Sequence, residues 1–152
     1  MPADISRIEA DLLLVEDDPD DCFMITRALR RIDPQLRIVT LRDGVELTEY
    51  LQARHAVPPP RLVILDLNMP RMDGREVLAW AQHHEHEAIR GIAFVVLSTS
   101  VEAQDRLRSQ SLNAAGFISK PDQFGELVEA LREVLAVHLR PSLPETAPCP
   151  AP

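Results

Sequence analysis

Short apolar runs recur along this chain, and each is followed by polar residues before the next segment begins. The runs at 12–15, 62–65 and 92–97 lack the polar alternation of a half-exposed strand, so they predict strands buried on both faces, as in a parallel sheet. Residues 37–41 form a shorter run of weaker apolar character. The predicted strands are residues 12–15, 37–41, 62–65, 92–97 and 116–119. Because helical spacing separates them, we expect an α/β fold, a five-stranded doubly wound parallel sheet with right-handed crossovers.

Five helices are expected between and after these strands. The first should begin at Pro19 and end before Asp33 and Pro34, since proline suits a first turn and disfavours helix before it. Asp43 should cap the second in a capping-box pattern with Glu46. The third should cover 77–81, and a polar fourth should run to about residue 112. The fifth, with Asp122 as candidate cap, has the apolar residues Leu127, Val128, Leu131, Val134, Leu135 and Leu139.

Polar groups with chemical potential follow four of the five predicted strands. The second strand supplies nothing comparable. In the flavodoxin-like strand order 2-1-3-4-5 that strand lies at an edge, far from the crevice where such sheets place ligands. The four groups should therefore converge at one edge of the sheet: Glu16 with Asp17, Asp66, Ser98 and Lys120.

This set of groups suits phosphoryl chemistry. Clustered carboxylates repel one another unless a cation intervenes, and oxygen ligands without nearby thiol or imidazole favour Mg²⁺. A carboxylate can also attack a phosphoryl group to form an acyl phosphate. Such transfer needs positioning and positive charge near the phosphoryl oxygens. A single acid after a strand is more often a turn or cap residue, so the coincidence at four strand ends carries the inference.

Composition excludes several other classes. The formal net charge of -8 argues against general binding to nucleic acid or anionic membranes. Cys22 and Cys149 do not form a disulfide framework, and no signal peptide or membrane-spanning stretch is present, so a cytoplasmic location is expected. The histidines of segment 83–87 lack a closing ligand and indicate a solvated helix end rather than a metal site.

The domain organisation is expected to be simple. Residues 1–10 form an N-terminal segment, 11–140 form one domain, and 141–152 form a proline-rich tail that should be disordered. No DNA-binding or enzymatic segment follows the last predicted helix, so we expect a stand-alone domain.

Four motifs carry a family resemblance. They are LLLVEDD at 12–18, LVILDLNMPRMDG at 62–74, VVLSTS at 95–100 and GFISKP at 116–121. In this order they resemble the receiver domain of two-component response regulators, over roughly residues 10–140. The resemblance implies that Asp66 is the phosphoacceptor.

The resemblance also assigns roles to the other groups. Lys120 should pair with phosphoryl oxygens, Ser98 should act as the switch hydroxyl, and Phe117 should be the rotating aromatic side chain of the switch. The bond between Lys120 and Pro121 is typically cis in that family. The implied Mg²⁺ site comprises Glu16, Asp17, Asp66 and the backbone carbonyl of Asn68, with Asp17 in direct contact and Glu16 acting through water. This leaves Asp18 as a turn or cap residue.

The expected function is signalling rather than enzymatic turnover. A sensor histidine kinase would phosphorylate Asp66, and the chain would promote only its own phosphorylation and dephosphorylation. The motifs are similar to those of regulators that serve bacterial phytochrome kinases. The apolar last helix suggests homodimerisation through helix 4, strand 5 and helix 5, with simple packing on the sheet as the alternative.

Two rival functions fit less well. A haloacid dehalogenase-type phosphohydrolase normally needs a second carboxylate two residues after its nucleophile, and this chain has Asn68 there. A flavodoxin has a phosphate loop rich in Ser, Thr and Gly after its first strand. Here residues 16–21 hold five acids and a proline, which would repel a phosphate that lacks a metal.

Overall fold

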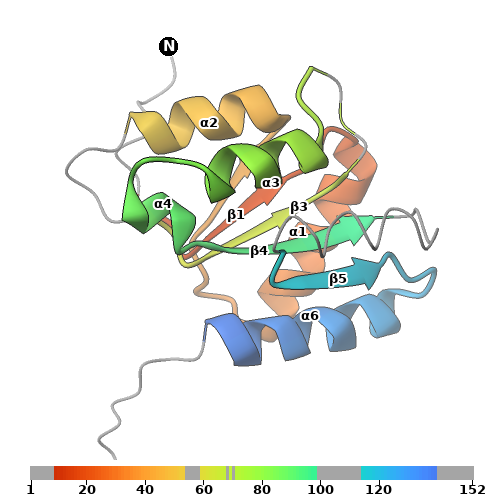
Figure 1. The fold of residues 1–152 in the computed structure, drawn as a ribbon. Helices are drawn as coiled ribbons and strands as arrows, with labels where there is room; N and C mark the ends of the chain where they lie inside the picture. The colour runs from red at the N-terminus through yellow and green to blue at the C-terminus, as the bar shows by residue number, and fades with distance from the viewer. Residues whose placement is uncertain (1–8, 54–58, 68, 70, 99–113, 140–152) are drawn as a thin grey trace, which may run out of the picture.

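A computed structural model describes residues 9–53, 59–67, 69, 71–98 and 114–139 (Figure 1). The elements are β1 (Leu12–Val15), α1 (Pro19–Ile32), β2 (Ile38–Leu41), α2 (Gly44–Gln52), β3 (Leu62–Leu65), α3 (Gly74–Gln82), α4 (Glu87–Arg90), β4 (Ala93–Ser98), β5 (Gly116–Ser119) and α6 (Phe124–His138). No described helix is both long and apolar enough to cross a bilayer.

The strands form one parallel sheet in the order β2-β1-β3-β4-β5, which confirms the predicted topology. Its ladder continues one residue past the central strands. The Asp66 N–H donates to the Val15 carbonyl over 3.1 Å, and the Glu16 N–H donates to the Leu41 carbonyl over 3.0 Å. Because both backbones are held this way, the two carboxylates leave the sheet at the same edge.

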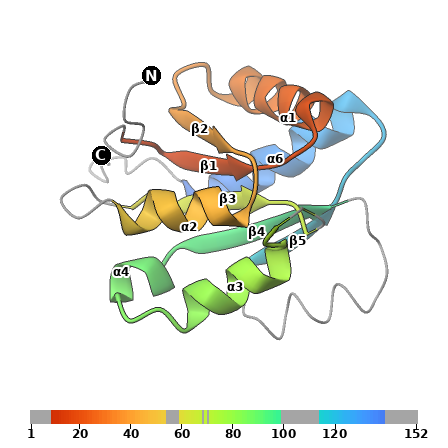
Figure 2. The ribbon, with the colours of Figure 1, turned by 90° about the horizontal axis from the view of Figure 1, so that it is seen from above.

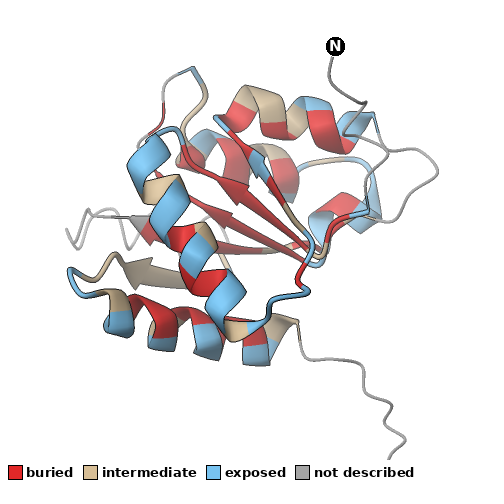
Figure 3. Ribbon diagram, turned by 180° about the vertical axis from the view of Figure 1, so that it is seen from behind, coloured by how far each residue is buried: buried red, intermediate tan, exposed pale blue. Residues whose placement is uncertain are grey.

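Helices cover both faces of the sheet. α1 and α6 lie on one face, and α2, α3 and α4 lie on the other (Figures 1 and 2). Alternate residues of β1 enter the two cores: Leu12 and Leu14 pack on the α1 and α6 side, and Leu13 and Val15 pack on the other. Figure 3 shows the central strands buried throughout. Continuous apolar runs therefore became strands because both faces are covered.

Local capping fixes where the helices begin. Asp18 caps α1 by accepting from the N–H groups of Asp20 and Asp21, with Pro19 in the first turn as predicted. Asp43 caps α2 by accepting from the Glu46 N–H. The reciprocal half of that predicted box does not form, because the Glu46 carboxylate accepts from the Arg42 N–H instead.

Three details differ from expectation. The cap of α6 is Gln123, without a side-chain bond, so the prediction for Asp122 is wrong; the helix begins one residue too late for it. The Lys120–Pro121 bond is trans and not cis as the family resemblance implied, and no described peptide bond is cis. The trans form is the usual one for X-Pro bonds. The four-residue helix α4 was not predicted, since one turn has no readable periodicity. The helix expected to end near residue 112 lies outside the described residues.

The apolar face of α6 is buried inside the molecule. Its residues pack against α1 and the sheet in one core cluster, which includes Leu127, Val128, Leu131, Val134 and Leu135. Packing on the sheet therefore accounts for the pattern that suggested a dimer.

Candidate functional site

Three carboxylates meet at the carboxyl edge of the sheet. Glu16 and Asp17 follow β1, Asp66 follows β3, and each offers an oxygen within 4.8 Å of the others. Glu16 and Asp66 are 4% and 8% exposed, whereas Asp17 is exposed. This donor set suits a hard divalent cation, which takes carboxylate oxygens and keeps water on its open side. Among the described residues it is the group that could hold a metal.

The electrostatics of Glu16 point to the same need for positive charge. Burial raises the pKa of Glu16 from 4.5 to about 7, the Lys120 hydrogen bond opposes this shift, and the negative charge of Asp66 adds to it. Two adjacent buried carboxylates disfavour full ionisation unless a cation balances them.

Lys120 supplies one cation from the end of β5. Its Nζ donates to Glu16 Oε1 over 2.9 Å and to Asp21 Oδ2 over 2.8 Å, and its side chain is 11% exposed. Burial alone would lower the Lys120 pKa, but the bonds to Asp21 and Glu16 outweigh it and leave the pKa raised. The ammonium therefore stays charged beside the acid cluster.

Gly74 allows the loop after Asp66 to turn tightly. Its N–H donates to the Leu67 carbonyl over 3.0 Å. A Cβ at this position would lie 2.7 Å from the Asp66 carbonyl oxygen and 2.8 Å from the Leu67 Cα. Both neighbours are backbone atoms that cannot swing aside, so glycine is required. Asp73 and Glu76 then start α3 with a complete capping box.

A second contact braces the β3–α3 loop. Arg71 lies in the left-handed region at φ 66°, which is unfavourable for an arginine. Its guanidinium donates two hydrogen bonds to the buried Asp43, from Nε to Oδ2 (2.7 Å) and from Nη2 to Oδ1 (3.1 Å). Burial of Asp43 would raise its pKa, but the bonds from Arg71 and from the Glu46 N–H outweigh this and lower it. The loop after β2 thus supports the loop that follows Asp66, and Asp43 lies outside the carboxylate group of Glu16, Asp17 and Asp66.

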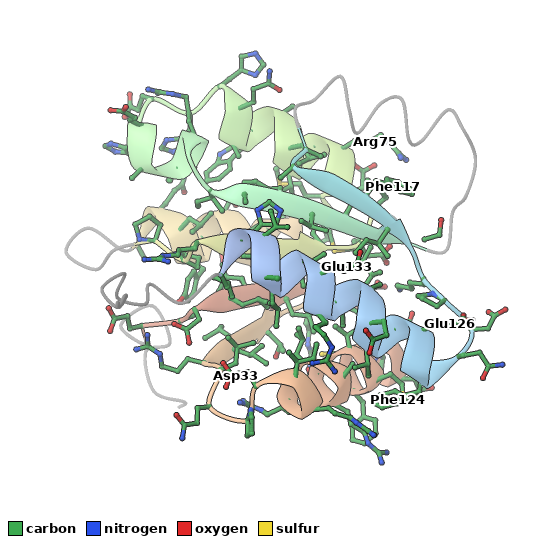
Figure 4. All side chains as sticks on the ribbon, turned by 90° about the horizontal axis from the view of Figure 1, so that it is seen from below. Asp33, Arg75, Phe117, Phe124, Glu126 and Glu133 are labelled. Atoms are coloured by element: carbon green, nitrogen blue, oxygen red, sulfur yellow. The ribbon has the colours of Figure 1, made fainter. Side chains whose placement is uncertain are left out.

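The remaining predicted residues are placed in part. Ser98 ends β4 in register with Ser119, next to Lys120, and only its backbone is described. Phe117 lies on β5, partly buried against the core on the α3 side of the sheet (Figure 4). Asn68 lies outside the described residues.

The histidine segment is a surface feature, as predicted. His83 and His86 are exposed, and the ring of the half-buried His84 contacts Trp80 edge-on, with ring centroids 4.8 Å apart.

Two residues that contact or support the site were missed from sequence. In the sequence, Asp21 belongs to the acid run at 16–21, and Arg71 belongs to the motif at 62–74. Helical spacing from Pro19 places Asp21 in the first turn of α1, but no sequence signal shows that this turn faces the end of β5.

Comparison with known proteins gives a consistent family. The family model of the response regulator receiver domain matches residues 12–132. The chain is 37% identical over 125 residues to the probable methanogenesis regulatory protein FilR2 of Methanothrix harundinacea, covering 81% of this chain and 79% of FilR2. It is 31% identical to the response regulator Rcp1 of Synechocystis, covering 81% and 84% of the two chains.

Solved structures agree with this assignment. The phosphorylated cyanobacterial phytochrome response regulator RcpA superposes with a TM-score of 0.76 at 32% identity, covering 94% of this chain and 99% of RcpA. The Mn²⁺-bound form of Rcp1 superposes with a TM-score of 0.72 at 30% identity, covering 93% and 99%. The phosphohydrolase alternative finds no support. The chain belongs to the response regulator receiver domain family.

Proposed function

We propose that this chain accepts a phosphoryl group on Asp66 from a sensor histidine kinase and signals through the resulting conformational change. One observation carries the proposal: the nearly buried Asp66 lies within 4.8 Å of Glu16 and Asp17 oxygens, in the electrostatic field of the Lys120 ammonium. A nucleophile, an acid cluster and a fixed cation at one sheet edge are what acyl phosphate formation requires.

The transfer step follows from these groups. A carboxylate oxygen of Asp66 attacks phosphorus, the phosphorus–nitrogen bond of the donor phosphohistidine breaks, and the imidazole leaves with the electron pair. Lys120 balances charge on the phosphoryl oxygens, and the Ser98 hydroxyl is proposed to donate to one of them. These roles place positive charge and a donor where charge develops.

Glu16, Asp17, Asp66 and the Asn68 backbone carbonyl are the residues proposed to hold Mg²⁺. The all-oxygen donor set and the raised pKa of Glu16 support a hard cation here. When bound, such an ion neutralises charge on the phosphoryl oxygens and on the carboxylates. The Mn²⁺-bound structure of Rcp1 supports a divalent site in a similar protein.

The proposed switch links Asp66 to β4 and β5. A phosphoryl group adds negative charge and three acceptor oxygens at the sheet edge. Ser98 would turn toward the phosphoryl group. Phe117 is paired in the sheet with Val96, which lies two residues before Ser98 on β4, and its ring would change its packing on the α3 side of the sheet. The face that includes β5 and α6 would thereby change shape and report phosphorylation.

The partners are proposed as follows. Similarity to RcpA supports a phytochrome kinase as the donor, in the cytoplasm. Homodimerisation through the fourth predicted helix, β5 and α6 would have to use outward residues such as Val137, which is 71% exposed, because the apolar face of α6 is buried. Light scattering on diluted protein, with and without beryllofluoride and Mg²⁺, tests this; monomer throughout would exclude the dimer.

A transfer assay tests the function. Wild type and Asp66→Asn are incubated with Mg²⁺ and a panel of autophosphorylated histidine kinases, with Asp33→Asn as an exposed-acid control. Label should pass to wild type and to Asp33→Asn but not to Asp66→Asn. Equal label on Asp66→Asn would contradict the assignment, and transfer from non-phytochrome kinases alone would contradict the named partner.

A further inference from the structure

Asp21 contacts the Lys120 ammonium but belongs neither to the metal-capable group of carboxylates nor to the motifs that carry the family resemblance. It lies in the first turn of α1, outside the metal-capable group of Glu16, Asp17 and Asp66, yet its Oδ2 is 2.8 Å from the Lys120 Nζ. We propose that Asp21 is a positioning residue that holds the Lys120 ammonium beside Asp66 while Glu16 is engaged by the metal ion. This inference rests on the function proposed above.

The hydrogen bonds of Lys120 show why a second anchor matters. An ammonium has three donors, and among the described contacts one donates to Glu16 and one to Asp21. The remaining donor is proposed to serve Asp66 or a phosphoryl oxygen. Because two fixed acceptors restrict rotation of the ammonium, the direction of the third donor is set by the fold rather than by the substrate.

Glu16 cannot serve as a constant anchor. Its Oε1 accepts from Lys120, and its Oε2 faces the Asp18 N–H at 3.3 Å. A divalent ion in the acid cluster would attract the Glu16 carboxylate. Less of the Glu16 negative charge would then be available to hold Lys120. Asp21 is not part of that cluster, so its carboxylate remains available when the site is loaded.

The backbone of Asp21 is held rigidly enough for this task. The Asp18 side chain accepts from the N–H groups of Asp20 (2.9 Å) and Asp21 (3.4 Å), which fixes the first turn of α1. Residues on a helix hold their partners more accurately than residues on a loop.

The pair is also asymmetric in burial. The Lys120 side chain is 11% exposed and the Asp21 side chain is 40% exposed, so the acid reaches inward from the rim. Both residues line a groove of about 290 Å³ between α1 and the start of α6. Replacing Asp21 by asparagine keeps the size of this partly exposed side chain, so no cavity forms. The effect of losing the charge should therefore fall on Lys120.

A single-residue label gives a direct readout. Lys120 is the only lysine in the chain, so ¹³C,¹⁵N-labelled lysine gives a single side-chain ammonium signal in NMR spectra. Spectra of wild type, Asp21→Asn and Asp20→Asn are recorded without metal, with Mg²⁺, and with Mg²⁺ and beryllofluoride. Asp20→Asn is the matched control, because it removes the same charge from the same helical turn without touching the Lys120 pair. The Mg²⁺ form of Asp21→Asn should show a lysine ammonium that exchanges faster with water, and Asp20→Asn should match wild type.

Phosphorylation kinetics complete the test. With acetyl phosphate as donor and saturating Mg²⁺, Asp21→Asn should be phosphorylated about fivefold more slowly than wild type, and Asp20→Asn should stay within about twofold. Asp21→Glu, which keeps the charge, should recover part of the rate. Faster phosphorylation of Asp21→Asn would show that Asp21 withholds Lys120, and identical behaviour of the two Asn variants, or an unchanged lysine signal, would likewise overturn the proposal. If wild type is not phosphorylated at all, the proposed function itself fails.

Discussion

Both edges of the sheet carry pairs of a basic and an acidic side chain, but the pairs are exposed to solvent at one edge and buried at the other. At the amino edge, Arg37 pairs with Asp11 (2.8 Å) and Glu9 (3.1 Å) in solvent, with the Arg37 side chain 55% exposed. At the carboxyl edge, Lys120 pairs with Glu16 (2.9 Å) where both side chains are nearly buried. The Arg37 hydrogen bond lowers the pKa of Asp11, whereas burial raises that of Glu16 to about 7.

This contrast separates structural pairs from functional ones. An exposed ion pair keeps most of its hydration, so forming it changes the free energy of unfolding very little. The buried cluster keeps carboxylates where their charged form is disfavoured, which is a feature of reactive sites. Changes at the carboxyl edge should therefore alter chemistry, and changes at the amino edge should alter little.

The largest expected effect comes from Lys120→Met. Loss of the fixed cation should slow phosphorylation of Asp66 by about 100-fold, the size expected when one donor that stabilises developing charge is removed. Arg37→Met at the amino edge is the matched control and should keep the wild-type rate. A rate for Lys120→Met within threefold of wild type would contradict the role of the ammonium. Acetyl phosphate kinetics measure both variants.

Asp43→Ala should have the next largest effect, on stability. It removes the cap of α2 and the partner of Arg71, so the free energy of unfolding should fall by about 2 kcal/mol in urea titrations. Asp73→Ala removes a capping box without an arginine partner and should cost about 1 kcal/mol. Equal losses in the two variants would mean that the Arg71 contact adds nothing.

The pH dependence of the metal-free protein tests the burial of Glu16. Because its pKa is raised from 4.5 to about 7 on folding, its contribution is fully present below 4.5 and is lost as the pH rises through 7. Urea titrations in chelator should show stability falling across this window, and Glu16→Gln should flatten the fall. Asp11 has the opposite sign, since its lowered pKa makes its contribution disappear only as the solution becomes acidic. A slope that Glu16→Gln leaves unchanged would place the titrating group elsewhere.

The smallest effect is expected at the amino edge. Arg37→Ala should lower the melting temperature by about 2 °C or less, and high salt should remove the difference, because the pairs are screened by solvent ions. A larger drop that persists in salt would show that this edge also depends on its ion pairs.

The sequence predicted the sheet well for a physical reason. Strands covered on both faces must be apolar, so β1, β3 and β4 could be located from composition, with Asp66 directly after β3. The edge strand β5 is half-buried, and Lys120 directly follows it. Asp122 is not the cap of α6, because the helix begins at Phe124, one residue later than that cap requires. The partners of Asp21 and Arg71 could not be predicted, because they depend on how α1 and the loops are oriented against the sheet.

Locating the phosphoryl group tests the central claim most directly. Protein phosphorylated with acetyl phosphate and Mg²⁺ is treated with borohydride, which reduces an aspartyl phosphate to homoserine, and the product is mapped by tandem mass spectrometry. Homoserine at position 66, absent from Asp66→Asn treated in the same way, is the predicted result. Homoserine at another acidic position, or equal modification of Asp66→Asn, would contradict the assignment of Asp66 as the phosphoacceptor.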